Sequence, residues 1–143
     1  MPVTKGIQTL VREANDAIET MPVMEAIKSH GDENIVFVDI RDLRELEREG
    51  MVPGAFHAPR GMLEFWVDPD SPYFKDVFGD DSKTFVLYCQ SAWRSALSTK
   101  ALNEMGMKNV IHFDGGFRGW VDAGGPVAEK KTHTPKHFQN KDN

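Results

Sequence analysis

The chain lacks paired cysteines, a membrane-length apolar run and an excess of basic residues. Its 143 residues contain one cysteine, so no internal disulfide can form and the fold needs no oxidising compartment. No segment approaches the roughly 18 apolar residues of a membrane span, and the first residues carry no apolar core of signal-peptide type. A net charge of −5 argues against nucleic-acid binding. We therefore expect one cytoplasmic domain that binds neither membranes nor nucleic acids.

The single cysteine, Cys89, follows a short apolar run at 84–88 that is rich in β-forming residues. Such a run is typical of a buried parallel strand. A helical pattern then extends from Ser95 to Met105 and is closed by Gly106. These patterns place Cys89 at the carboxyl end of a strand, with five residues before the helix, which is where open α/β sheets bind ligands.

The predicted position of Cys89 favours a reactive thiol. A thiol becomes a nucleophile when it ionises, and the positive end of a helix stabilises the thiolate. Backbone N–H groups of residues 90–95 would form an anion-binding concavity around the sulfur. Arg94 adds a cation whose planar fork suits oxyanions. Together these features predict a thiolate beside a cradle for a small anion or a second sulfur, rather than an inert buried cysteine.

The rest of the chain alternates between strand and helix patterns, which predicts a parallel sheet covered on both faces. Asp42 and Glu45 have the spacing of a capping box, and we interpret the charged helix that follows as a solvated face. The other expected helices are 4–16, 22–30, 61–66, a segment that begins at Ser71-Pro72, 95–105 and 117–122. The expected strands are 17–20, 35–38, 55–58, 84–88 and 110–113.

Three motifs now support a family resemblance. Cys-x-x-x-x-Arg-Ser at 89–95 resembles the active-site loop of the rhodaneses, the single-domain thiosulfate sulfurtransferases. Residues 36–59 contain Asp-Ile-Arg and then Gly-Met-Val-Pro-Gly-Ala, similar to the family's first signature. Residues 110–127 contain Gly-Gly-Phe-Arg-Gly-Trp and then Gly-Gly-Pro, similar to its last signature. Because all three occur in order, residues 17–127 are identified as a rhodanese-like domain.

The resemblance implies a rhodanese-like α/β fold, with a five-stranded, mainly parallel sheet and helices on both faces. Residues 1–16 would then be a helical extension and residues 128–143 a polar, mobile tail. The implied reaction moves a sulfane sulfur from thiosulfate or a similar small anionic donor onto Cys89, as a persulfide, and then to cyanide, a thiol or a sulfur-accepting protein. No metal or cofactor is implied, and the protein would be a monomer or a homodimer.

The resemblance also assigns roles to residues around Cys89. Asp39 and Arg41 match the family's Asp-x-Arg and would hold the end of the second strand near the loop. The segment after the third strand would approach the loop, although packing into the core is the favoured interpretation for Phe65 and Trp66. The candidates for lining the pocket are Arg60, Glu64 and Trp66. The residues of the persulfide-binding loop are Gln90, Ser91, Ala92, Trp93, Arg94 and Ser95.

The loop departs from the family pattern at Ala92, where many members carry glycine. Alanine there implies either a right-handed loop conformation or strain of about 1 kcal/mol. The bulky Trp93 beside it is expected at the rim of the pocket.

Two other functions stay open. Related phosphatases place five residues, not four, between cysteine and arginine, which makes a wider cradle for phosphate, and they need a general acid. A phosphatase or arsenate reductase is therefore less favoured, and a sulfur-carrier or interaction module with little turnover is the other alternative. The histidines are not expected to be catalytic: His57 and His112 are interpreted as structural, and zinc binding by His133 and His137 is not expected.

Overall fold

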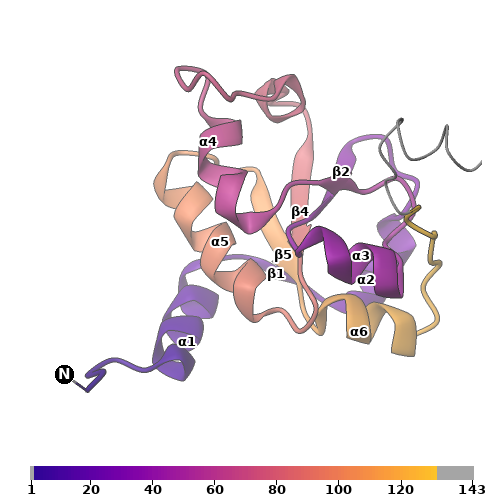
Figure 1. Ribbon diagram of the computed structural model, residues 1–143, viewed down its shortest axis with the longest axis horizontal. Helices are drawn as coiled ribbons and strands as arrows, with labels where there is room; N and C mark the ends of the chain where they lie inside the picture. Colours follow the sequence, from indigo (N-terminus) through magenta and orange to yellow (C-terminus); the bar gives the residue numbers. More distant parts are fainter. Residues whose placement is uncertain (1, 132–143) are drawn as a thin grey trace, which may run out of the picture.

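A computed structural model describes residues 2–131. In this part of the chain, five strands form one sheet in the order β1–β5–β4–β2–β3, and every neighbouring pair is parallel. Figure 1 shows this sheet at the centre of the molecule, with helices around it. The predicted five-stranded parallel architecture is confirmed. The strands are β1 (Thr20–Met21), β2 (Ile35–Asp39), β3 (Phe56–His57), β4 (Thr84–Tyr88) and β5 (Val110–Phe113).

Within residues 2–131, six α-helices and two 3₁₀ helices connect and cover the strands (Figure 1). The predicted capping box forms, because Asp42 and Glu45 each bind the other's backbone N–H at the start of α3. The α-helices are α1 (Ile7–Ala17), α2 (Val23–Ser29), α3 (Leu43–Glu49), α4 (Leu63–Val67), α5 (Trp93–Glu104) and α6 (Gly116–Asp122), and the 3₁₀ helices are η1 (Arg60–Met62) and η2 (Asp76–Gly79).

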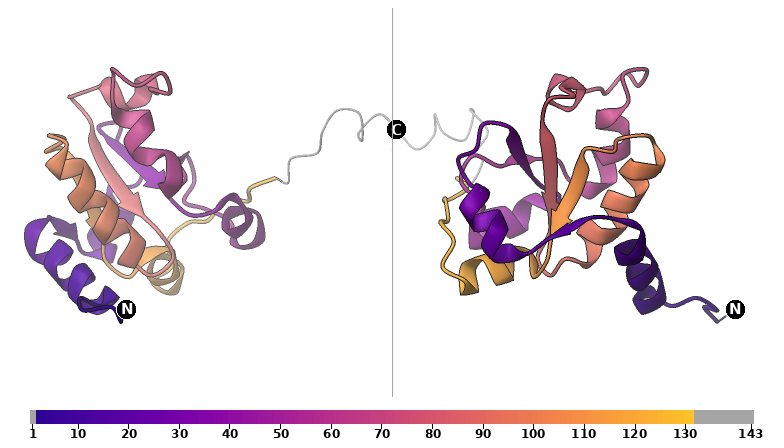
Figure 2. Two further views of the ribbon diagram at one scale, coloured as in Figure 1. Left: turned by 60° about the vertical axis from the view of Figure 1, so that its left-hand side comes forward. Right: turned by 180° about the vertical axis from the view of Figure 1, so that it is seen from behind.

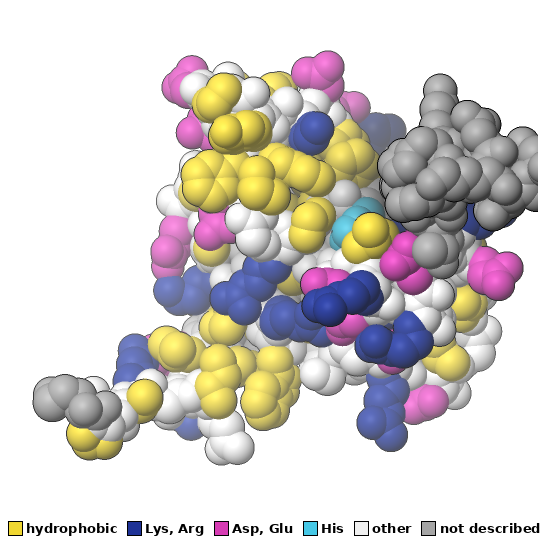
Figure 3. Space-filling view, in the orientation of Figure 1, with side chains coloured by type: hydrophobic (Ala, Val, Ile, Leu, Met, Phe, Trp, Pro, Cys, Tyr) yellow, Lys and Arg dark blue, Asp and Glu magenta, His cyan; other side chains and the backbone are white. Residues whose placement is uncertain are grey.

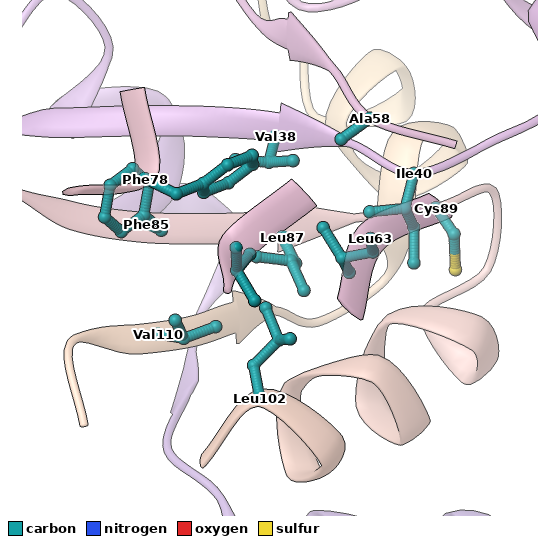
Figure 4. Close-up of a cluster of buried hydrophobic side chains, with 11 residues drawn as sticks. Val38, Ile40, Ala58, Leu63, Phe78, Phe85, Leu87, Cys89, Leu102 and Val110 are labelled. Atoms are coloured by element: carbon teal, nitrogen blue, oxygen red, sulfur yellow. The ribbon is translucent and has the colours of Figure 1, made fainter. Parts of the chain in front are cut away.

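Alternation along β4 divides the core into two layers, because successive side chains of a strand point to opposite faces. Phe85 and Leu87 pack with residues of α4 and α5 on one face. Val86 and Tyr88 pack with residues of α2 and α6 on the other. Figure 2 shows the sheet between these helices from two further directions. Cys89 continues the alternation and lies on the α4–α5 face, at the end of the cluster drawn in Figure 4.

The direction of the chain across the sheet reverses between β2 and β4. From β2 the chain moves to β3 on one side, whereas from β4 it moves to β5 on the other. Adjacent carboxyl ends at such a reversal leave a crevice where α/β proteins bind ligands. Asp39 pairs with Tyr88 at this edge, so the residues that follow them, Ile40 to Arg41 and Cys89, emerge side by side.

Two predicted elements were wrong. The first strand is Thr20–Met21 rather than 17–20, because α1 continues through Ala17. No α-helix begins at Ser71. Its hydroxyl accepts the Tyr73 N–H in a local turn, and only the short η2 follows, since side-chain bonds of this kind compete with helix formation.

The N-terminal helix α1 packs against α5, where Val11 and Ala14 meet Ala96. Within residues 2–131, none of the helices has the length and apolar character needed to cross a membrane. Ala128 forms an antiparallel bridge with Met51. Most of the predicted tail, residues 132–143 with His133 and His137, lies outside the described part of the chain.

Candidate active site

The Cys89 side chain lies at the carboxyl end of β4 and is almost completely enclosed. The residue is 1% exposed and packs with the apolar side chains of Ile40 and Leu63 (Figure 4). The backbone N–H of Ser95, in the first turn of α5, points at the sulfur with an N to Sγ distance of 3.3 Å. An N–H at a helix start favours a negatively charged sulfur.

The loop after Cys89 is shorter than the sequence pattern indicated. Helix α5 begins at Trp93, so three residues rather than five separate it from Cys89, and Arg94 belongs to the helix. Ala92 makes this possible by adopting a left-handed conformation, with φ 69° and ψ 5°, directly before the helix. A non-glycine residue there carries strain of about 1 kcal/mol. Of the two alternatives for Ala92, the structure has the strained one.

Arg94 forms a two-pronged ion pair with Glu45 of α3. Its two terminal nitrogens each lie 2.9 Å from a different carboxylate oxygen. The pKa of Arg94 is raised chiefly by these hydrogen bonds, and the neighbouring Cys89 sulfur adds to the effect. The Arg94 guanidinium lowers the pKa of Glu45 in turn. Sequence reasoning missed Glu45 as a site residue, because its capping-box spacing indicated a solvated helix and nothing local indicates a partner 49 residues away.

The Asp39–Arg41 pair supports the loop from the opposite face of the sheet. Arg41 is completely buried and binds both Asp39 oxygens, with an Nη2 to Oδ2 distance of 2.8 Å. Its guanidinium stacks on Phe117 and donates to the Gln90 side chain at 3.0 Å. Burial lowers the pKa of Arg41, but the hydrogen bond and charge of Asp39 outweigh that effect and raise it. The pair therefore fixes the first loop residue without facing the sulfur.

The start of α6 holds the backbone of the loop. The N–H groups of Phe117 and Arg118 donate to the carbonyls of Cys89 and Gln90, at 2.8 and 3.2 Å. Gly116, with φ +62°, lies directly against these carbonyls, and a Cβ there would lie 2.5 Å from the Gln90 oxygen. Close approach of two backbones requires glycine. The sequence motif contained Gly116, but sequence reasoning did not identify its contact with the loop.

A buried histidine lies behind the start of α5. His112 Nε2 is 3.2 Å from Asn15 Oδ1, and Nδ1 is 2.9 Å from the Ser95 hydroxyl. An amide oxygen only accepts hydrogen bonds, so Nε2 carries the hydrogen and Nδ1 accepts from Ser95. His112 thus orients Ser95, whose N–H faces Cys89, and links α1 to the loop.

The unfolding free energy should fall in mild acid because of His112. Burial lowers its pKa to about 4, from 6.5 in an unfolded chain. Between these values the unfolded chain binds a proton that the folded chain does not, so stability decreases as the pH falls through 6.5 toward 4. We expect a loss of about 2 kcal/mol between pH 7.5 and 5, measured by urea unfolding. His112→Gln should remove that part of the pH dependence; an unchanged slope would assign it to other groups.

The segment after β3 approaches Cys89 through Leu63, but the residues named for the pocket do not lie with it. Arg60 and Glu64 are exposed, and within residues 2–131 neither forms an ion pair or a side-chain hydrogen bond with the loop. Trp66 is half-buried, packs against the core and meets Phe56 edge to face. Phe65 was expected to pack in the core beside Trp66, but its side chain is 54% exposed. The short helix α4 buries only the face that carries Leu63 and Val67, and Phe65 lies on another face.

The other loop residues differ in exposure. Trp93 is 47% exposed at the first position of α5, and Ser91 is also exposed. A cavity of about 560 Å³ lies between Val67 and Met107 at the amino end of the sheet. It is remote from Cys89, so we do not assign it to the reaction.

Comparisons with known proteins agree with this geometry. The family model described as "Rhodanese-like domain" matches residues 23–123. A candidate sulfurtransferase of Bacillus subtilis, YtwF, is 33% identical over 103 residues, which cover 72% of this chain and 87% of that protein.

Two solved structures extend the comparison. A Rhodopseudomonas palustris protein of unknown function, described as a candidate tyrosine phosphatase, is 50% identical, with a TM-score of 0.86 over 90% of this chain and 98% of that one. The polysulfide-sulfur transferase homodimer of Wolinella succinogenes is 27% identical, with a TM-score of 0.65 over 91% of this chain and 92% of that one. The two descriptions name different reactions, phosphate ester cleavage and sulfur transfer, so the geometry of the site has to decide which of them this chain supports.

Proposed function

The chain belongs to the rhodanese-like family, and from that premise we propose that it is a sulfurtransferase that carries sulfane sulfur as a persulfide on Cys89. The observation that carries the proposal is the enclosed Cys89 sulfur, which faces the Ser95 N–H at the start of a twelve-residue helix. That environment stabilises a negative charge on the attacking sulfur and later on the persulfide.

The reaction would proceed by double displacement. The Cys89 thiolate attacks the outer sulfur of thiosulfate or a related donor, the donor's S–S bond breaks, and sulfite leaves with the bonding electron pair. Cyanide, a cellular thiol or an acceptor protein then takes the terminal sulfur and returns the thiolate. Both leaving groups depart as stable anions, so neither step requires an acid from the protein. Since one cysteine requires no oxidising compartment, the cytoplasm remains our prediction for its location.

A phosphatase reaction fits the site less well, although the Rhodopseudomonas protein carries that description. A phosphatase arginine has to bind the phosphate oxygens, whereas both terminal nitrogens of Arg94 already bind Glu45. Phosphate ester cleavage also needs a proton for the leaving alkoxide. Turnover of p-nitrophenyl phosphate, blocked by alkylation of Cys89, would favour the phosphatase over the sulfurtransferase.

The mass of the intact protein tests the proposal. After incubation with thiosulfate and desalting, we expect a gain of one sulfur atom, which cyanide removes as thiocyanate. The added sulfur can be assigned to Cys89 without peptide mapping, because the sequence contains no other cysteine. A folded protein with a free thiol that gains no sulfur from thiosulfate, polysulfide or an organic persulfide would contradict the proposal. Sulfur uptake with slow release to cyanide would favour a sulfur carrier.

A further inference from the structure

Arg94, five residues after Cys89, is already paired with a carboxylate in the structure. It directly precedes Ser95, whose N–H meets the Cys89 sulfur, and its guanidinium binds Glu45. The Arg94 and Glu45 side chains are only 36% and 18% exposed, so solvent screens their charges incompletely. With Cys89 ionised, the trio carries a net charge of −1 before any donor arrives.

The neighbouring arginines repeat this balance. Arg41 pairs with Asp39, Arg44 with Asp42 and Arg48 with Glu49, at N to O distances of 2.8, 3.0 and 3.6 Å. Figure 3 shows a row of basic side chains across the middle of one face, with a few acidic side chains beside it. Each of these arginines thus has a carboxylate that offsets its charge toward an approaching dianion, whereas Arg60 and Arg118 form no ion pair within residues 2–131.

We propose that Glu45 is a specificity-determining residue that disfavours dianionic sulfur donors relative to singly charged ones. Its carboxylate cancels the Arg94 charge and adds a repulsion that grows in proportion to the charge of the donor. The factor by which Glu45 slows a dianion is therefore the square of the factor for a monoanion in the same position. This inference rests on the proposed sulfur transfer for its meaning, but its electrostatic basis can be measured separately.

Two donors that differ in one charge provide the test. Thiosulfate carries two charges and releases sulfite, whereas methanethiosulfonate carries one and releases methanesulfinate. In both, the Cys89 thiolate attacks the terminal sulfur, the donor's S–S bond breaks, and the leaving anion takes the electron pair. The value of kcat/KM with each donor, at saturating cyanide and low ionic strength, measures how strongly the site discriminates between the two charges.

Glu45→Gln removes the charge and, because an amide nitrogen replaces one carboxylate oxygen, one of the two hydrogen bonds from Arg94. Glutamine keeps an oxygen for the Asp42 N–H, and it is accepted at this position of a capping box. We expect kcat/KM to rise about tenfold for thiosulfate and about threefold for methanethiosulfonate, and both gains to shrink as salt is added. Glu47→Gln, with the same charge change in the same helix, is the matched control and should alter the ratio little.

Alkylation of Cys89 measures the same discrimination without sulfur transfer. We expect Glu45→Gln to raise the ratio of the rates with anionic iodoacetate and neutral iodoacetamide about threefold, since the ratio cancels any change in the amount of thiolate. If alkylation shows this rise but neither donor delivers sulfur, the proposed function fails and the role of Glu45 stands. Three outcomes would each overturn the role of Glu45. They are an equal change in kcat/KM for both donors, an unchanged alkylation ratio, and the same rise in the Glu47→Gln variant.

Discussion

Cys89→Ser is expected to lower sulfur transfer from thiosulfate to cyanide by at least about a thousandfold. A serine hydroxyl does not ionise near neutral pH, and the thiolate is the species that attacks sulfur. The substitution changes one atom, and the Ser95 N–H retains an acceptor, so the unfolding free energy should change by no more than about 1 kcal/mol. Steady-state thiocyanate formation and urea unfolding measure the two quantities.

The contrast between activity and stability makes this result informative. A variant that loses activity because it unfolds would lose both together. Cys89→Ala serves as a second variant, since it removes the side-chain acceptor and leaves the buried Ser95 N–H without it. We expect it to be as inactive as Cys89→Ser and less stable. Residual activity above about a tenth in Cys89→Ser would mean that sulfur passes from donor to acceptor without bonding to the protein.

The parts of the site that the sequence predicted are those set by local rules. An apolar run of β-forming residues produced β4, and the Asp42–Glu45 spacing produced the capping box. Cys89 follows the run directly, so its place at the carboxyl end of a strand required only the length of the run. Each of these features depends on neighbours within a few residues, where propensity and hydrogen-bonding chemistry are strong guides.

The parts that the sequence did not predict depend on tertiary contacts. The left-handed conformation of Ala92 contradicts its own preference, and the surrounding contacts hold it, including those of α6 with the loop carbonyls. That conformation moves the start of α5 from Ser95 to Trp93. The Arg94–Glu45 pair likewise joins two charged residues that, within their own helices, have the pattern of solvated surface.

Gly116→Ala is expected to reduce the unfolding free energy by about 4 kcal/mol. The added Cβ would lie 2.5 Å from the Gln90 carbonyl oxygen and 2.8 Å from that of Cys89, and both are backbone atoms that cannot rotate away. Relief requires α6 to move off the loop, which breaks the hydrogen bonds from Phe117 and Arg118. The midpoint of urea unfolding should fall accordingly, and sulfur transfer should fall with it because the loop loses its backing.

Gly124→Ala separates the steric part of this loss from the conformational part. Gly124 also has a positive φ, +86°, but a Cβ there would meet no atom within 4 Å. Its substitution should cost only the strain of a left-handed residue, about 1 kcal/mol, and should leave sulfur transfer unchanged. The difference between the two variants measures the close approach of α6 to the loop. Equal losses would mean that the loop tolerates a side chain at 116, and that α6 does not hold the Cys89 and Gln90 carbonyls in place.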